Sequence, residues 1–481
     1  MDFSELVYIF WATLLHKIKA WWAYRTHPVF QKRGQHDAIV ARVRGDVKQR
    51  NGRPLSMKRS NASSHCTRTQ EYKNACHLVD VSDLDCILDI DTVNECMTVQ
   101  PLCRMDRITE TLALYGFSLP VTPEFKGITI GGTLAGGGLE SSSFRYGMVQ
   151  ESVLEYDLVL GNGDLITVSP TKHADLFYGS MWSLGTTGIV VRVKTKIIPA
   201  MPYVHLSYQY FEERSEFVKT LGAACERDDI DFLEGVQLDF NTSVLIYGKR
   251  VATPPARVDK YRNSLWFHQW FIDHLEERNV DAWMDLHDYL FRWDRGVYWN
   301  ARRKITPTFW KRMLFGWLFD METSHTASRM KSDHSNESKR ILTDVGPPLS
   351  QLQRLLDYQE THIGLREVWC LPFRLFQHEE SIFSCEKTIQ ESICIDVGIY
   401  GVPKTADGGV RTFDAVEMNQ ELEAFVHDEC RGMKGFETPC YYQDFEHFGS
   451  YFDLEKYDTL RKKYHAHSAF PHVFSKIEHS F

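Results

Sequence analysis

The pattern of apolar and polar positions predicts alternating helices and strands in the first part of the chain. Apolar residues recur at helical spacing in residues 36–50 and predict a helix. Two alternating runs flank the dipeptide Asn162-Gly163 and predict a β-hairpin over residues 153–169. A further helix is predicted to end at Gly116. Short β-rich runs predict strands at residues 75–84, 86–103 and 185–200.

The pattern changes after about Pro202, where longer aromatic stretches at residues 262–278 and 310–321 predict helices. A polar stretch at 324–339 predicts a loop, and strands and a helix follow it at 367–376, 393–403 and 452–465. The whole is an α+β pattern without internal repeats. We therefore expect a short N-terminal helix (1–27), an α+β nucleotide-type domain (28–202), and a mixed α/β substrate or cap domain ending in helices (203–481).

The N-terminal segment carries an apolar run of ten residues, Leu6–Leu15, in which Thr13 is the one polar side chain, followed by basic residues and the pair Trp21-Trp22. Ten helical residues rise about 15 Å, roughly half of a hydrocarbon core. Aromatic and basic residues together favour the headgroup region. We expect a helix that lies in a membrane interface, with the bulk of the chain facing the cytoplasm. A buried docking helix is the alternative, and no cleavage site indicates a signal peptide.

Length, net charge and cysteine pattern limit the classes of protein to which this chain can belong. A chain of 481 residues is too long for a single hydrophobic core, so more than one domain is expected. The formal net charge of −9 argues against nucleic-acid binding, which requires a basic face. Eleven cysteines contain no C-x-x-C pair, so no metal site is predicted, and scattered thiols are typical of a reducing compartment. The oligomeric state stays open.

The most unusual stretch is "GITIGGTLAGGGLESSSFRYG", a glycine-rich loop at residues 127–147. Glycines at this density allow a backbone to approach a ligand closely, so bare N–H groups could bind a pyrophosphate. The alternative is structural, with glycines in tight turns or bulges. No G-x-G-x-x-G fingerprint occurs in the chain, which argues against a conventional NAD domain.

Two further loops accompany this segment, one polar at residues 57–64 and one glycine-containing at 181–193. In this order the three resemble the vanillyl-alcohol-oxidase-type flavoproteins with a PCMH-type FAD-binding domain. Longer pieces, among them "ESSSFRYG" (140–147) and "IDVGIYG" (395–401), resemble the Delta(24)-sterol reductase (24-dehydrocholesterol reductase, Diminuto) family. The resemblance extends from about Ala20 to the C-terminus.

That resemblance implies a reductase of the sterol side-chain Δ24 double bond at the endoplasmic reticulum membrane, with FAD as cofactor and NADPH as hydride donor. His65 lies just beyond the position that carries covalent flavin in related oxidases, so non-covalent FAD is expected. The residues predicted to contact FAD come from all three loops. They are Arg59, Ser60, Asn61, Ser63, Thr129, Gly131, Gly132, Thr133, Gly136, Gly137, Gly138, Glu140, Ser141, Ser142, Ser183, Gly185, Gly188, Ile189 and Val190.

Reduction of an isolated alkene also requires an acid in a dry pocket. Asp396 and Tyr400 are the candidates, because their strand resembles a family segment. The alternatives are an ordinary turn or strand-end residue for Asp396 and simple packing for Tyr400. Two other functions stay open: a flavin oxidase of a hydroxylated small molecule, and a catalytically silent flavin- or sterol-binding scaffold.

Overall fold

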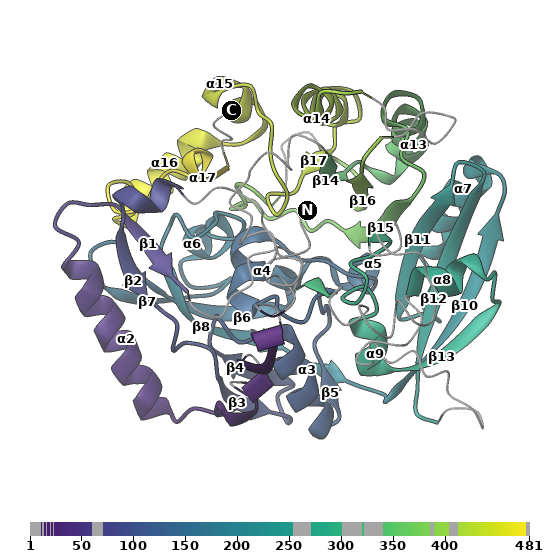
Figure 1. Ribbon diagram of the computed structural model, residues 1–481. Helices are drawn as coiled ribbons and strands as arrows, with labels where there is room; N and C mark the ends of the chain where they lie inside the picture. The colour runs from purple at the N-terminus through teal and green to yellow at the C-terminus, as the bar shows by residue number, and fades with distance from the viewer. Residues whose placement is uncertain are drawn as a thin grey trace.

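The computed structural model describes residues 24–59, 71–253, 271–300, 340–384, 389–403 and 412–477, with residues 320–321 and several positions between 11 and 22. Three predicted FAD contacts, Ser60, Asn61 and Ser63, lie outside the described residues. So do the polar stretch 324–339 and most of the aromatic segments 262–278 and 310–321. The described parts combine helices and sheets in one α+β structure (Figure 1).

A five-stranded antiparallel sheet lies at the centre of the first unit, in the order β3-β4-β8-β6-β7. The predicted hairpin is confirmed, because Val159 of one strand pairs with Leu165 of the next. In β8 every second side chain is buried, as expected for a strand with one face in the core. The strands are β3 (Ile87–Asp91), β4 (Cys96–Val99), β6 (Val153–Val159), β7 (Leu165–Val168) and β8 (Ile189–Lys196), with α3 (Met105–Leu114) following β4.

The first helix and a small parallel sheet flank this unit. The helix predicted at 36–50 is α2 (Arg33–Lys48), whose buried face contains Val40, Val43 and Val47. The small sheet pairs β1 (Leu55–Lys58) with β2 (His77–Asp80). Short elements complete the unit: η1 (Glu71–Ala75), β5 (Phe117–Ser118), α4 (Ile130–Gly136), α5 (Ser143–Tyr146), η2 (Val149–Ser152), α6 (Ala174–Gly179) and β9 (Ile198–Pro199).

An eight-stranded antiparallel sheet forms the second unit, in the order β13-β10-β12-β11-β15-β16-β14-β17. Helices pack on one face of it, where Leu221, Leu355 and Leu422 meet Val397 and Ile399 of β16 in one core. The strands are β10 (Tyr203–Phe211), β11 (Phe232–Asp239), β12 (Thr242–Val251), β13 (Asp281–Asp285), β14 (Ile341–Gly346), β15 (Val368–Arg374), β16 (Ile393–Gly401) and β17 (Met433–Lys434). The helices of this unit are α7 (Arg214–Ala224), α8 (Phe271–Glu276), α9 (Leu286–Leu290), η5 (Leu349–Gln351), α13 (Leu352–Tyr358), η6 (Gln359–Ile363), α14 (Ala415–Ala424) and η7 (Phe425–Glu429).

The last described segment returns to the first unit. It contains α15 (Phe445–Tyr451), α16 (Leu454–Lys463) and α17 (Phe474–Ile477), of which α16 and α17 are drawn in yellow near β1 in Figure 1. Leu55 N donates to the backbone O of Ala469 (2.6 Å), and Phe470 lies in one core with α2. The predicted boundary at 202/203 falls between β9 and β10 and stays a prediction.

The described residues between Trp11 and Thr26 are helical. Their large apolar side chains are exposed, with Trp21 at 55% and Trp22 at 64%. Among the described residues, no helix combines the length and apolar character that crossing a bilayer requires.

Candidate active site

The glycine-rich segment begins as a helix, which corrects the expectation of a loop. Thr129 caps α4, because its Oγ1 accepts a hydrogen bond from Gly132 N (3.3 Å). Gly131 N donates to the backbone O of Pro101 (2.8 Å). A Cβ at Gly131 would lie 2.5 Å from Pro101 Cβ, so the close approach of two backbones requires glycine there. The first N–H groups of the segment are therefore used within the protein.

Unused N–H groups lie further along. Within the part of the chain that the structure describes, the backbone N–H groups of Gly138, Leu139 and Gly185 donate no hydrogen bond. All three residues line one cavity of about 290 Å³, at the lower end of the range for ligand pockets. Unpaired backbone donors that face a cavity are typical of anion sites.

Charged side chains of both signs line the same cavity. The basic ones are Arg59, Lys73 and Lys476, and Lys476 Nζ donates to the backbone O of Leu184 (2.8 Å), beside Gly185. Together with the unpaired N–H groups, these cations suit a diphosphate. The residues present therefore fit FAD. The predicted contacts that line the cavity are Arg59, Thr129, Gly131, Gly132, Thr133, Gly136, Gly137, Gly138, Gly185, Gly188 and Val190.

The acidic side chains come from the second sheet. Asp396 and Tyr400 lie four residues apart on β16 and so share the face that borders the cavity. Asp344 of β14 lies opposite Gly398, between them, and accepts a hydrogen bond from the Tyr400 hydroxyl. A Cβ at Gly398 would lie 2.6 Å from Tyr400 Oη, so glycine leaves room for this contact. The structure thus brings both candidate acids to the cavity that the glycine segment lines.

Burial raises the pKa values of these acids. Burial raises the pKa of the Asp344 carboxyl to about 7 and that of Glu124 to about 8. Burial and then the neighbouring charge of Asp344 raise the pKa of Asp396 well above its ordinary value. Among the described residues, nothing hydrogen-bonds to the Asp396 carboxyl, whereas Tyr298 Oη donates to Glu124 (2.8 Å). Asp396 is therefore a buried acid at the cavity whose carboxyl keeps its proton to higher pH than an exposed aspartate does, and none of the described residues hydrogen-bonds to it.

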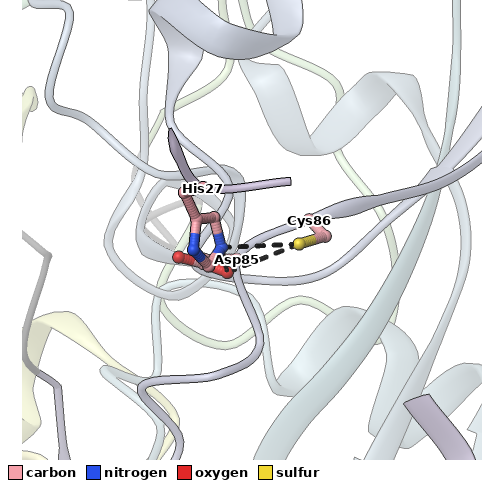
Figure 2. Close-up of side chains that lie close together, drawn as sticks. All are labelled: His27, Asp85 and Cys86. Carbon is pink, nitrogen blue, oxygen red and sulfur yellow. Dashed lines mark hydrogen bonds and ion pairs between the residues drawn. The ribbon is translucent and has the colours of Figure 1, made fainter. Parts of the chain in front are cut away.

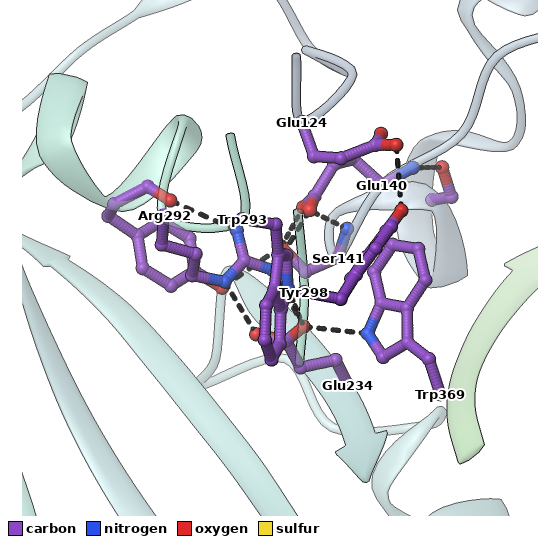
Figure 3. Close-up of polar contacts among 10 residues, drawn as sticks. Glu124, Glu140, Ser141, Glu234, Arg292, Trp293, Tyr298 and Trp369 are labelled. Carbon is purple, nitrogen blue, oxygen red and sulfur yellow. Dashed lines mark hydrogen bonds and ion pairs between the residues drawn. The ribbon is translucent and has the colours of Figure 1, made fainter. Parts of the chain in front are cut away.

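A buried ion cluster lies next to the cavity (Figure 3). The Arg292 guanidinium contacts Glu140 (2.9 Å) and Glu234 (2.7 Å), and all three side chains are at most 2% exposed. Trp293 Nε1 (3.1 Å) and Trp369 Nε1 (2.9 Å) also donate to Glu234. The cluster ties the glycine-rich segment, through Glu140, to the second sheet.

Five predicted FAD contacts lie outside the cavity lining, and their predicted role stays a prediction. Glu140 and Ser141 belong to the Arg292 cluster, and Ser141 accepts a hydrogen bond from Tyr289 Oη (2.9 Å). The other three have contacts within the first unit: Ser142 Oγ donates to the backbone O of Pro120 (2.8 Å), Ser183 Oγ to that of Ser180 (2.7 Å), and Ile189 is fully buried.

Comparison with known proteins now adds to this geometry. A family model described as FAD binding domain matches residues 49–169. Human Delta(24)-sterol reductase is 31% identical over 438 residues, which cover 85% of this chain and 79% of the human protein. The chain belongs to the Delta(24)-sterol reductase family. The pea Delta(24)-sterol reductase is 25% identical over 98% of this chain and 88% of its own length. Cytokinin dehydrogenase 3 of Arabidopsis thaliana is 35% identical over 109 residues, only 22% of this chain.

Membership confirms the predicted family and the FAD-binding domain, and it makes the protein an FAD-dependent oxidoreductase. The sequence interpretation missed several residues of this family member's cavity: Glu124, Tyr298, Asp344 and Glu437. Asp344 carried a usable signal, since it is the one acidic residue in an otherwise mostly apolar run, Ile341–Gly346. No sequence signal identified Glu124 or Tyr298, because their hydrogen bond joins two segments that are far apart in the chain.

Proposed function

We propose that this protein reduces the Δ24 double bond of a sterol side chain, with NADPH as hydride donor and non-covalent FAD. One observation carries the proposal. One cavity joins the backbone N–H groups of Gly138, Leu139 and Gly185, which donate no hydrogen bond to any described residue, to the buried acid Asp396, whose pKa is raised. A reductase of an isolated alkene requires a flavin site and a proton donor in one enclosed space. The names of the human and pea relatives support the sterol as substrate.

The chemistry that bound FAD supplies is hydride transfer from a reduced nicotinamide to one alkene carbon. The chain's own task is to protonate the other carbon. Asp396 is the proposed donor, because it lines the cavity, burial raises the pKa of its carboxyl, and it makes no competing hydrogen bond among the described residues. Tyr400 is already a donor to Asp344, so we assign it a positioning role.

The wall around these acids excludes water from the reaction. Trp369, Phe373 and Met433 line the cavity beside them and are at most 3% exposed. A dry site strengthens proton transfer to a carbon that develops positive charge. The sequence contains no G-x-G-x-x-G fingerprint for a separate nicotinamide site, so we propose that NADPH and the sterol use the cavity in turn, which gives ping-pong kinetics.

We also propose that the protein works at the endoplasmic reticulum membrane, with its bulk on the cytoplasmic side. The exposed side chains Ile18, Trp21 and Trp22 support an interfacial helix, because aromatic and aliphatic groups favour the headgroup boundary. A sterol substrate would then reach the enzyme from the bilayer.

The decisive experiment separates the two half-reactions. Purified protein is reduced anaerobically with NADPH, in parallel with NADH, and the flavin absorbance is followed. The reduced protein is then mixed with desmosterol, and flavin reoxidation and the reduced sterol are measured. We expect bleaching by NADPH and recovery on sterol addition. An oxidase would ignore NADPH and be bleached by its alcohol substrate, and a scaffold would do neither.

A pair of variants tests the proton donor. Asp396→Asn should bind FAD and be bleached by NADPH as the wild type is, yet reduce the sterol about 100-fold or more slowly. Glu423→Gln is the matched control. Glu423 is a buried acid whose pKa burial raises to about 7, but it lies outside the cavity lining. Equal sterol rates in Asp396→Asn and the wild type would refute the assignment.

A further inference from the structure

Three side chains with metal-binding atoms converge where the N-terminal segment meets the FAD-binding unit (Figure 2). His27 Nε2 lies 2.8 Å from Asp85 Oδ1 and 3.6 Å from Cys86 Sγ. Cys86 Sγ in turn lies 3.6 Å from the same Asp85 oxygen. The three atoms therefore form a closed triangle. Without a cation, hydrogen bonds satisfy these groups: the His27 ring pairs with Asp85, and the Cys86 thiol donates to the backbone O of Pro28 (3.3 Å).

The triangle has the dimensions of a zinc-type site. With metal bonds of about 2.0 Å to nitrogen and oxygen and about 2.3 Å to sulfur, tetrahedral geometry places sulfur about 3.5 Å from either neighbour and nitrogen about 3.3 Å from oxygen. Both distances from Cys86 Sγ match. The distance between His27 and Asp85 is shorter, so a cation would move these two groups apart by about 0.5 Å.

The backbone holds the three residues in place. Asp85 and Cys86 are neighbours in the sequence and lie just before β3, outside the strand. Side chains of neighbouring residues point to opposite faces only within a strand, so these two side chains are not forced apart. Cys86 N donates to the side-chain Oε1 of Gln100 (2.8 Å), and Gln100 N donates to the backbone O of Cys86 (2.9 Å). Arg107 Nη1 donates to the backbone O of His27 (3.2 Å). Cys86 is buried, whereas the His27 side chain is 41% exposed, which leaves an approach from solvent.

We propose that His27, Asp85 and Cys86 bind one zinc-type divalent cation, with water as the fourth ligand. Binding would replace the Cys86 thiol proton, which passes to solvent, by a sulfur–metal bond. The cation would fasten the N-terminal helix to the FAD-binding unit. The spacing of these residues along the sequence is no known metal motif, which is why the sequence predicts no site. This proposal is independent of the proposed sterol reaction.

The test uses the full-length, FAD-loaded protein in detergent. After treatment with EDTA and dialysis, cobalt(II) chloride is added. Spectra are recorded at wavelengths longer than the flavin bands for the d–d transitions, and as differences against the cobalt-free protein in the near ultraviolet. We expect the intense d–d bands of tetrahedral cobalt, together with a thiolate-to-cobalt band in the difference spectrum, at one cobalt per chain. Zinc chloride should abolish both by displacement.

Variants assign the ligands. Cys86→Ser should lose the sulfur band, and Asp85→Asn should weaken zinc binding by about tenfold or more. Cys96→Ser is the matched control, because Cys96 is also buried, in β4 of the adjacent sheet. Flavin content and the unfolding midpoint show whether each variant folds. If Cys86→Ser does not fold, the wild-type spectrum decides. No tetrahedral cobalt signal in the wild type, or equal signals in wild type and Cys86→Ser, would overturn the proposal.

Discussion

Replacing Arg292 by methionine should destabilise the protein by about 3–5 kcal/mol, because the change leaves two buried carboxylates without a counter-charge. The guanidinium is 1% exposed and binds Glu140 and Glu234, which are 2% and 0% exposed. It also donates through Nη1 to the backbone O of Tyr289 (3.0 Å). Methionine keeps most of the side-chain volume, so lost packing contributes little to the effect.

The size of this loss of stability depends on which carboxylate becomes protonated when the Arg292 charge is removed. Glu234 keeps two indole donors, Trp293 and Trp369, and can stay ionised. Among the described residues, Glu140 keeps only Ser141 as a donor, and burial already raises the pKa of Glu140 against the opposing charge of Arg292. Protonating a carboxyl of ordinary pKa, about 4.3, costs about 3.7 kcal/mol at pH 7. This value lies within the expected range.

The same reasoning fixes the sign of the pH dependence. In the variant the pKa of Glu140 in the folded state is raised further, so stability is retained at low pH and lost as the pH rises. The difference between variant and wild type should therefore shrink by about 1.4 kcal/mol for each pH unit below 7. Urea unfolding followed by tryptophan fluorescence, at pH 7 and at pH 5.5, measures this difference.

A triple variant serves as the control. Arg292→Met combined with Glu140→Gln and Glu234→Gln removes all three charges and should recover most of the lost stability. A loss below about 1 kcal/mol at pH 7 in the single variant, or a loss that does not change with pH, would refute the reasoning.

Two further changes test the cavity. Gly137 has φ +92° and a Cβ there would lie 2.5 Å from the Trp182 ring, so Gly137→Ala should cost about 1–3 kcal/mol and lower the flavin-to-protein absorbance ratio. Gly45→Ala, at an open helical position, should leave that ratio unchanged, and equal ratios in both variants would contradict the prediction. Asp344→Asn removes a charge that raises the pKa of Asp396, so the alkaline limb of sterol reduction should move to lower pH. Stopped-flow reoxidation of the reduced flavin across a pH series measures this shift, and a limb that stays in place or moves upward would argue against Asp396 as donor.

The parts of the site that could be predicted from the sequence are those that a single short segment specifies. The alternation of β16 places Asp396 and Tyr400 on one face, and motif resemblance indicated the FAD-binding unit. The helix at 130–136 was missed, because glycine disfavours helices. Here the Thr129 cap and the contact with Pro101 override that local preference.

What could not be predicted depends on pairing between distant segments. Asp344 reaches Tyr400 only because β14 and β16 pair with Asp344 opposite Gly398, and the sequence does not specify this register. The Arg292 cluster likewise joins three segments that are far apart in the chain. Local patterns identify elements, whereas the chemistry of this cavity is set by which elements become neighbours.

The C-terminal segment packs against the first unit, and this determines at which stage of synthesis the protein can bind FAD. Lys476 of α17 forms part of the same wall as Arg59, and residues 466–470 complete the core around α2. During synthesis, the ribosome therefore releases the residues with the predicted flavin contacts long before the residue that completes their enclosure. Stable flavin uptake should be a late event that follows translation of α17, and nascent chains stalled before that helix should hold the cofactor weakly or not at all.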